Sequence, residues 1–390
     1  MQLKTYKIVS GIKAKLVLLR LELRLLAFLI FKFKNPRIVL VNWRNIQNTI
    51  QQFTIDQRFQ RLVKHEGKYF FNCNMPGWPQ TNFFDKILAI SNPQLKNDLS
   101  ALGIVQIGFT KKCPLNCEHC YEGKILNQPE TISLNDHIAI VKKLQNNQVS
   151  VIQFGGGEPL NRFDDLINVL KSANDTSDFW IYSSGYGLTE ERARELKSEG
   201  LTGVSISLDH FESDAHNSFR RNQKSFDWAL TAIKNAQKAN LLTAMSICVT
   251  NEFCSEENLF QYVYFAARQN VAFVQMLEPR ATGNYEGKDV LLTNENKAIL
   301  ELFYEKINSN KEFKTLPILQ YTGYQQRKKG CAGAGNRYIY IDTDGYVQSC
   351  PFCRNKKSHF LTGDLKRDLS ELKMEGCDYI KNENKESSYA

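Results

Sequence analysis

The sequence predicts an α/β fold built on parallel strands, and two observations lead to this fold class. Beyond residue 103, six short β-rich runs follow one another, and a helix-like segment fills every gap between them. The composition is that of a folded globular chain, because 42% of the 390 residues are hydrophobic and 23% are charged, which excludes a disordered or collagen-like protein. Periodicity alone leaves open whether such strands close into a barrel or form an open sheet.

The strands and helices are assigned from their apolar patterns and from their capping residues. The β-rich runs are residues 104–109, 149–154, 179–183, 204–208, 243–250 and 271–277. The helix-like segments are residues 134–146, 163–173, 190–199, 226–239 and 256–269. Ser133, Thr189 and Ser255 precede three of these segments and are suitable N-cap residues. Because parallel α/β folds bind ligands at the carboxyl ends of their strands, functional residues are expected directly after each strand.

The N-terminal segment carries the net charge of the chain. Residues 1–44 contain ten Lys and Arg and one acidic residue, Glu22, so this segment accounts for the whole net charge of +9. Residues 12–34 predict one basic amphipathic helix that ends before Pro36. Its longest apolar run, residues 25–31, is too short to span a bilayer. The helix either lies on an anionic membrane surface or packs against the main domain, and no nucleic-acid binding is expected because no known binding module accompanies it.

No secretion signal is expected at the N-terminus. Arg20, Glu22 and Arg24 interrupt the apolar stretch, and no small-residue cleavage site follows it. The ten cysteines are therefore interpreted as thiols of a reducing, cytoplasmic compartment, with a peripheral location if the helix contacts a membrane. Three parts of the chain are expected: an N-terminal helix with an accessory region (residues 1–100), a core (101–310) and a small C-terminal domain (311–390).

A cysteine motif directly follows the first strand of the core. Cys113, Cys117 and Cys120 have the spacing C-x3-C-x2-C. Three thiolates in one loop can hold three irons of a 4Fe-4S cubane and leave the fourth iron open to another ligand. Zinc needs a fourth ligand, for which His119 is badly placed because it lies between two of the cysteines.

This motif, followed by Tyr121, resembles that of the radical S-adenosylmethionine (radical SAM) superfamily. Gly155-Gly156-Gly157-Glu158 after the second strand is similar to the Gly-Gly-Glu motif of that family. The resemblance covers about residues 103–280 and implies a partial, six-stranded βα barrel that binds S-adenosylmethionine (SAM) and a 4Fe-4S cluster on Cys113, Cys117 and Cys120. It implies these cofactor-binding residues: Tyr121, Gly156, Gly157, Glu158, Ser183, Ser207, Asp209 and Val249.

Two later strand ends refine the resemblance. Ser183-Ser184-Gly185 stands where the family commonly has Thr-Asn-Gly, so this sequence departs from the pattern there. Asp209 ends a segment that resembles the family's Ser-Leu-Asp. It is followed by His216 and Arg220, near where related proteins place a polar contact to the cofactor.

A second group of cysteines lies near the C-terminus. Cys331 is followed by thirteen residues, Gly345, four residues and Cys350, and then by Cys353 and Cys377. Residues 337–341 and 346–349 flank the turn sequence Asp342-Thr-Asp-Gly345 and predict a hairpin. The spacing resembles the auxiliary-cluster extension called SPASM, or its shorter twitch form. The resemblance implies a second, auxiliary 4Fe-4S cluster on Cys331, Cys350, Cys353 and Cys377, although four thiolates also satisfy zinc.

The resemblance implies a radical enzyme. A reducing electron donor would drive cleavage of SAM to a 5′-deoxyadenosyl radical, which abstracts hydrogen from a substrate carbon. An auxiliary cluster favours an oxidative modification of a peptide or protein side chain, and a small molecule or lipid is the alternative substrate. A non-catalytic iron-sulfur or zinc protein is a third hypothesis, but it leaves the Gly-Gly-Glu motif unexplained. No catalytic acid, base or thiol is identified; Cys248 and Glu278 are candidates only by their strand-end positions.

Overall fold

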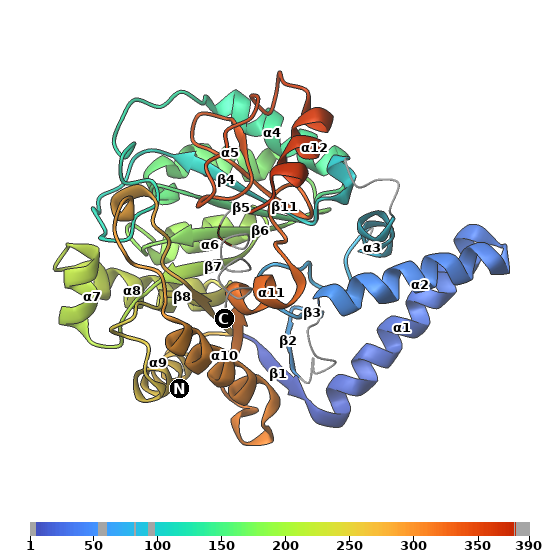
Figure 1. Ribbon diagram of the computed structural model, residues 1–390, viewed down its shortest axis with the longest axis horizontal. Coiled ribbons are helices and arrows are strands. Elements are labelled where there is room, and N and C mark those ends of the chain that lie inside the picture. Colours follow the sequence, from blue (N-terminus) through green and yellow to red (C-terminus); the bar gives the residue numbers. More distant parts are fainter. Residues whose placement is uncertain (1–4, 54–60, 82, 93–97, 378, 380–390) are drawn as a thin grey trace.

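A partial βα barrel forms the body of the protein, as the sequence predicts. The computed structural model describes residues 5–53, 61–81, 83–92, 98–377 and 379. Its six central strands are parallel and lie in chain order (Figure 1). They are β4 (Ile104–Thr110), β5 (Val151–Gly156), β6 (Asp178–Ser183), β7 (Leu201–Ser207), β8 (Leu242–Cys248) and β9 (Phe273–Leu277). Each overlaps one of the six predicted runs.

Three further strands extend this sheet, and none of them was predicted as part of it. β10 (Ile318–Tyr321) pairs with β9 in parallel, and β11 (Tyr338–Ile341) pairs with β4 in parallel. β12 (Val347–Gln348) pairs with β11 in antiparallel fashion and forms the predicted hairpin. The order in the described chain is β10-β9-β8-β7-β6-β5-β4-β11-β12, so the two edges of the barrel stay apart.

Helices cover the outer face of the sheet. They are α4 (Leu134–Asn146), α5 (Phe163–Ser172), α6 (Glu190–Ser198), α8 (Ser225–Lys238) and α9 (Glu256–Arg268), which confirms the five predicted segments. The side chains of Ser133, Thr189 and Ser255 each accept a hydrogen bond from the backbone three residues on, as N-caps do. The short polar helix α7 (Ser213–Arg220) follows β7 and was not predicted.

Alternation along the strands separates the core from the barrel interior. Ile107, Phe154 and Val274 point outward into one apolar core beneath the helices and are at most 1% exposed. Their neighbours Gln106 and Gln153 line the cavity inside the barrel instead. The amides of the interior strands therefore face a ligand space rather than the core.

The N-terminal region closes the amino end of the barrel. β1 (Lys7–Ser10), β2 (Arg61–His65) and β3 (Lys68–Phe70) form a small antiparallel sheet. Val63 and Phe70 pack with Trp180 and Phe273 at the amino ends of the barrel strands. Lys68 also pairs with the buried Asp178 at 3.2 Å. The predicted accessory layer is thus a plug beneath the barrel.

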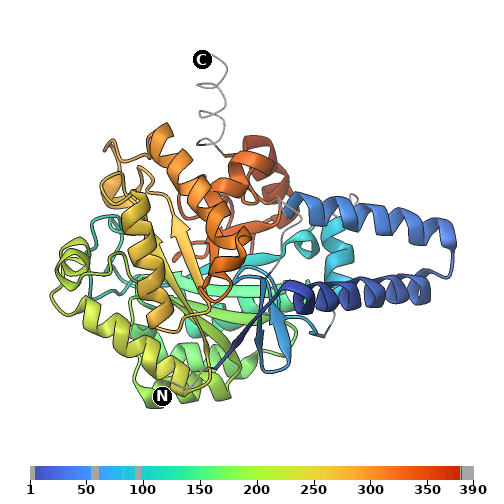
Figure 2. The same ribbon diagram turned by 90° about the horizontal axis from the view of Figure 1, so that it is seen from below.

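Two long helices extend away from this plug. α1 (Gly11–Phe33) confirms the predicted N-terminal helix, and α2 (Pro36–Phe53) runs back beside it as an antiparallel hairpin (Figure 2). Pro36 does more than end the first helix, because it begins the second one at a position that suits proline. α3 (Phe83–Ser91) packs against α2. Of the described helices, none combines the length and apolarity needed to cross a bilayer.

The C-terminal elements follow the barrel strands. They are α10 (Asn294–Ser309), α11 (Thr322–Lys329) and α12 (Leu365–Glu375), with the 3-10 turns η4 (Gly283–Tyr285) and η5 (Lys311–Phe313). Two other 3-10 turns lie earlier in the chain: η2 (Leu99–Ala101) precedes β4, and η3 (Pro159–Arg162) lies between β5 and α5. Strands β10 to β12 lie beyond residue 310 and share the sheet of the core.

Candidate functional site

A cavity of about 490 Å³ opens at the carboxyl ends of the barrel strands. Its lining includes the two groups of cysteines: Cys113, Cys117, Cys120, Cys331, Cys350, Cys353 and Cys377. Among the described residues, no three His, Cys, Asp or Glu side chains converge on one metal-ion position, whereas a cubane places each thiolate at a separate iron. The cysteines that the sequence assigns to two sites thus share one chamber.

The first group lies on the loop between β4 and α4. Burial raises the pKa of the Cys113 and Cys120 thiols to about 12, and it also raises the pKa of Cys117. These groups are therefore protonated in the absence of iron, and iron binding releases their protons. Arg220 donates from Nη1 to Cys117 Sγ at 3.6 Å, which favours the thiolate at that position.

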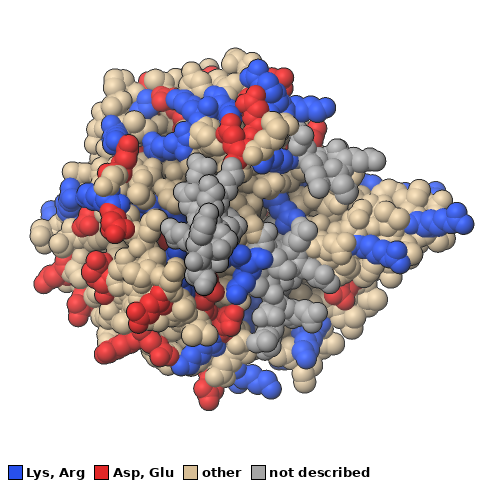
Figure 3. Space-filling view, in the orientation of Figure 1, with Lys and Arg blue, Asp and Glu red and all other residues tan. Residues whose placement is uncertain are grey.

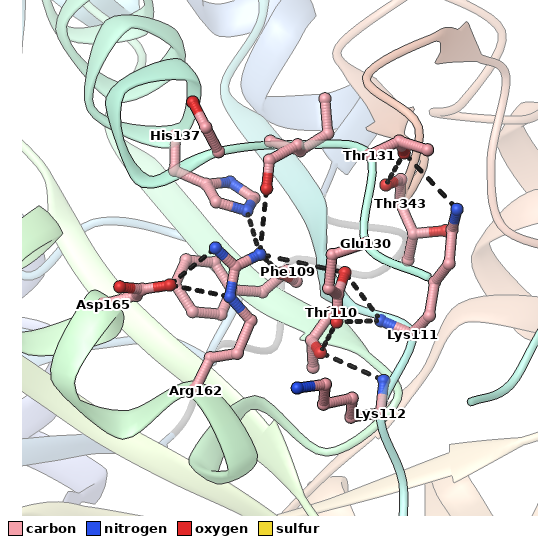
Figure 4. Close-up of polar contacts among 12 residues, drawn as sticks. Phe109, Thr110, Lys111, Lys112, Glu130, Thr131, His137, Arg162, Asp165 and Thr343 are labelled. Carbon is pink, nitrogen blue, oxygen red and sulfur yellow. Dashed lines mark hydrogen bonds and ion pairs between the residues drawn. The ribbon is translucent and has the colours of Figure 1, made fainter. Parts of the chain in front are cut away.

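Partly buried polar contacts hold the base of this loop (Figure 4). The Glu130 carboxylate accepts hydrogen bonds from the Thr110 hydroxyl and from the Lys111 backbone N–H, the latter at 3.1 Å. Arg162 binds Asp165 at 2.6 Å. Its Nη1 also donates to the Ile132 carbonyl at 3.1 Å. Both ends of the cysteine loop are thereby fixed to the body of the barrel.

His137 contacts Arg162 in this network, and its burial predicts that the stability of the protein falls at acidic pH. Burial first, and then the charge of Arg162, lower the pKa of His137 to about 4. The unfolded chain binds the proton near pH 6.5, so this contribution to stability is complete above pH 6.5 and is lost as the pH falls toward 4. We expect the His137→Phe variant to escape about 2 kcal/mol of the destabilisation that wild type suffers between pH 7 and pH 5. Urea unfolding of both proteins at the two pH values measures this, and equal losses would contradict it.

The Gly-Gly-Glu turn packs against the base of the cysteine loop. The N–H of Gly157 donates to the Thr110 carbonyl at 2.7 Å, and the N–H of Glu158 donates to the Lys112 carbonyl at 2.8 Å. A Cβ at Gly157 would lie 2.4 Å from that Lys112 oxygen. Gly156 has a φ of +102°, which side-chain-bearing residues rarely adopt. The resemblance assigns these glycines to cofactor binding. Their lack of a side chain also allows the backbone of the cysteine loop to pack closely against them.

Glu158 is buried and fully hydrogen-bonded. One carboxylate oxygen accepts from the Ser183 hydroxyl at 2.8 Å and from the Leu160 N–H at 3.2 Å. The other accepts from the backbone and the hydroxyl of Ser184, at 2.8 and 2.6 Å. Burial raises the pKa of Glu158, and these donors oppose that rise. Ser183 and Ser184, where the sequence departs from Thr-Asn-Gly, thus orient the glutamate.

Asp209 and Arg220 form a buried ion pair beside the cysteine loop. Asp209 Oδ2 accepts from Arg220 Nε at 2.6 Å, and Oδ1 accepts from the Cys248 N–H at 3.0 Å. The Asp209 N–H donates to His216 Nδ1 at 3.0 Å, which places the proton of a neutral His216 on Nε2. Burial alone would raise the pKa of Asp209, but the Arg220 charge lowers it overall. Helix α7 supplies both His216 and Arg220.

The other sequence-predicted cofactor residues divide into two groups. Tyr121 and Ser207 line the cavity together with the residues described above. Val249 is fully buried in the core, and its N–H donates to the Leu277 carbonyl at 2.8 Å. It does not line the cavity, so its role at the cofactor stays a prediction.

The C-terminal cysteines lie together. Cys353 Sγ is 3.8 Å from Cys377 Sγ, and the Cys353 N–H donates to Cys350 Sγ at 3.2 Å. Contact with Cys377 and burial both raise the pKa of Cys331. Four cysteines far apart in the sequence therefore lie near one another, and thiolates are the ligand type of both 4Fe-4S clusters and structural zinc. In the described part of the chain they do not converge on one metal-ion position, as a single zinc would require.

Direct contacts join the two cysteine regions. Arg354, which follows Cys353, pairs with the buried Glu122 at 3.1 Å. The rings of Tyr121 and Phe352 meet edge to face with centroids 5.8 Å apart. The C-terminal segment thus rests on the first cysteine loop, a relation that cysteine spacing alone does not reveal.

The negative charge of the Glu278 carboxylate is balanced by two neighbouring arginines. Its Oε1 accepts from the Tyr321 hydroxyl at 2.6 Å and pairs with Arg327 at 2.7 Å, while Oε2 lies 3.1 Å from Arg280. Burial opposes ionisation of this carboxyl, but the two arginines lower its pKa overall. A carboxylate held in this way is a weak proton acceptor, which argues against Glu278 as a general base.

Comparison with known proteins identifies the barrel. Residues 107–261 match the model of the Radical SAM superfamily. The chain is 28% identical over 268 residues to the mycofactocin maturase MftC of Mycolicibacterium smegmatis, covering 67% of this chain and 66% of that protein. It is 25% identical over 209 residues to a GTP 3',8-cyclase of Helicobacter pylori, covering 52% and 63%. The chain thus spans just under two thirds of the length of these relatives.

Two solved structures share the fold. Streptococcus suis SuiB bound to precursor peptide SuiA superposes with a TM-score of 0.59 at 14% identity, covering 91% of this chain and 82% of SuiB. Native anSMEcpe with bound AdoMet has a TM-score of 0.51 at 16% identity, covering 69% and 81%. The cysteine loop, the Gly-Gly-Glu turn and the matched family model agree, and the family implies a 4Fe-4S cluster and SAM. Residues 107–261 therefore form a radical SAM domain, and the relatives that the chain resembles in sequence are enzymes.

Proposed function

We propose that this enzyme is a maturase that oxidises a side chain of a peptide or protein, with a radical-generating cluster on Cys113, Cys117 and Cys120. The C-terminal region, residues 311–390, would hold an auxiliary 4Fe-4S cluster on Cys331, Cys350, Cys353 and Cys377. The observation that carries the proposal is that both cysteine groups line one cavity. Two comparisons support it: one relative is named a maturase, and SuiB was solved with a precursor peptide.

In this proposal the residues around the cavity have different roles. Cys113, Cys117 and Cys120 would hold the cluster, which together with SAM would supply a 5′-deoxyadenosyl radical for removal of a hydrogen atom from the substrate. Ser183 and Ser184 hold Glu158, which can accept hydrogen bonds from the amino group of SAM only if one present donor gives way. Arg220 keeps a positive charge against Cys117.

The barrel interior supports a peptide substrate. Amide side chains line the cavity: Asn72, Asn74, Gln106, Gln153, Gln275 and Gln320. A peptide chain would pair with them by replacing some of their present hydrogen bonds, such as that between Gln275 and Ser205 at 2.8 Å. Loss of one hydrogen atom, one further electron and one proton gives a two-electron oxidation. An auxiliary cluster facing the same cavity would receive that electron.

Iron content tests the two-cluster assignment. Anaerobically reconstituted wild type should contain about eight irons per chain, and the Cys331→Ala/Cys350→Ala variant about four. The variant should still form 5′-deoxyadenosine, because the first cysteine loop is unchanged. The matched control is Cys254→Ala, which removes a buried thiol outside the cavity lining and should keep all the iron. Four irons with stoichiometric zinc in wild type would reject the auxiliary iron-sulfur cluster.

The substrate class has its own test. We expect co-expression with a short peptide encoded beside the gene to lower the peptide mass by about 2 Da, the loss of two hydrogens, in a SAM-dependent manner. Mass spectrometry of the peptide measures this. Turnover of SAM with an unchanged peptide would favour the small-molecule or lipid alternative.

A further inference from the structure

We propose that the hairpin of α1 and α2 docks the enzyme on an anionic lipid surface. The two helices pack against each other and α2 packs against α3, while α1 also contacts β1 and β2 and α2 also contacts α11. On α1 the packed side is a stripe of four buried residues, namely Ala14, Leu21, Leu25 and Leu29. This stripe accounts for the attachment of the hairpin and leaves the rest of α1 for another role.

A second apolar stripe runs along the opposite side of α1 and is exposed. It consists of Ile12, Leu16, Leu19, Leu23 and Ile30, which are 51–78% exposed. With 100° of rotation per residue, these positions fall within a narrow sector facing away from the buried stripe. A helix that only packed against the main domain would present polar residues there.

The exposed apolar surface continues at the tip of the hairpin. Phe31 is 82% exposed, and Ile38, Leu40 and Val41 at the start of α2 are 43–55% exposed. Nine of the fifteen large hydrophobic side chains that are exposed in the described part of the chain lie between residues 12 and 41. Concentration in one projecting element is unlike the scattered exposure that ordinary surfaces show.

Cationic side chains flank this surface. Lys13 and Arg20 lie on one border of the exposed stripe and Lys15 lies on the other, while Lys34 and Arg37 are exposed at the tip. Residues 23–53 contain no Asp or Glu. In Figure 3 the hairpin, at the right of the view, shows mainly uncharged and basic surface, whereas most acidic surface lies on the body.

The positive charge of the N-terminal segment indicates which partner covers the exposed apolar stripe: a second copy of this chain or an anionic bilayer. A second copy of this chain would bring two segments of net charge +9 into contact, which is repulsive. An anionic bilayer neutralises the same charge, and its acyl boundary accepts the apolar stripe. Because no described helix can cross a bilayer, the contact is interfacial, with the helices lying in the headgroup region.

Vesicle sedimentation of the full-length, reconstituted enzyme tests this docking. We expect binding to phosphatidylcholine vesicles containing about one third phosphatidylglycerol to be at least about tenfold tighter than to pure phosphatidylcholine, and to weaken with salt. Lys13→Gln/Arg20→Gln should weaken it by about fivefold for each charge removed. Equal binding to the two kinds of vesicle would overturn the proposal.

A pair of matched variants tests the apolar stripe. Leu16→Asn/Phe31→Asn should lower vesicle binding by about tenfold or more. Leu291→Asn/Leu302→Asn changes two exposed leucines on the body and should leave it unchanged. Iron content and 5′-deoxyadenosine formation verify that all variants are folded. Full vesicle binding by the hairpin variant would overturn the proposal. If that variant instead lost a dimer that wild type forms in solution, while its vesicle binding stayed unchanged, the stripe would be an interface between two copies of the chain and the proposal would also be overturned.

Discussion

Replacing Cys117 with alanine is expected to lower 5′-deoxyadenosine formation by at least about a thousandfold, because two thiolates are not expected to retain a cubane on this loop. Cys117 is the most buried of the three loop cysteines and has the Arg220 contact at 3.6 Å. Its loss therefore also leaves a buried guanidinium without one of its acceptors. Anaerobic reconstitution followed by chromatography of the SAM products measures the effect.

The iron count separates a local effect from a collapse of the protein. The Cys117→Ala enzyme should keep about four irons, those assigned to the C-terminal cysteines, and should show the electron paramagnetic resonance signal of that cluster alone. The control is Cys73→Ala, which removes a fully buried thiol of the N-terminal plug. If Cys117→Ala retained SAM cleavage, the assignment of this loop to the radical-generating cluster would be wrong.

Much of the barrel could be predicted because its elements carry local signals. Buried parallel strands read as short apolar runs, and Ser133, Thr189 and Ser255 mark helix starts by chemistry that is complete within four residues. The pairing of β11 with β4 joins residues more than 200 positions apart. No local pattern encodes such a pairing, so the sequence indicated the hairpin but not the sheet it joins.

The candidate site also has a part that the sequence predicts, the cysteine ligands, and a part that it does not, the residues that orient them. Cysteine spacing marks a ligand loop because the three thiols must reach one cluster from one short segment. The contacts that orient those ligands come from elsewhere: Ser184 reaches Glu158 from the next strand, and Arg220 reaches Cys117 from helix α7. A serine or an arginine after a strand is common in any α/β protein, so only the folded geometry shows what these two bind.

The Asp209–Arg220 pair provides the other large expected effect. Asp209→Leu should destabilise the protein by about 3–5 kcal/mol, because it leaves the Arg220 guanidinium buried without its carboxylate. It also leaves the Cys248 N–H without its acceptor, now 3.0 Å away. Chemical unfolding of the reconstituted enzyme, followed by circular dichroism, measures the loss against wild type.

A double variant separates the stability of the pair from its role at the cluster. Asp209→Leu/Arg220→Met removes both charges, so it should recover most of the stability that the single variant loses, as paired replacements of buried ions do. It should not recover SAM cleavage, because the positive charge beside Cys117 is gone. A double variant as unstable as Asp209→Leu would show that the buried charge of Arg220 is not the cause of the destabilisation. Recovery of SAM cleavage in the double variant would remove Arg220 from the cluster environment and leave the pair a purely structural part of the barrel.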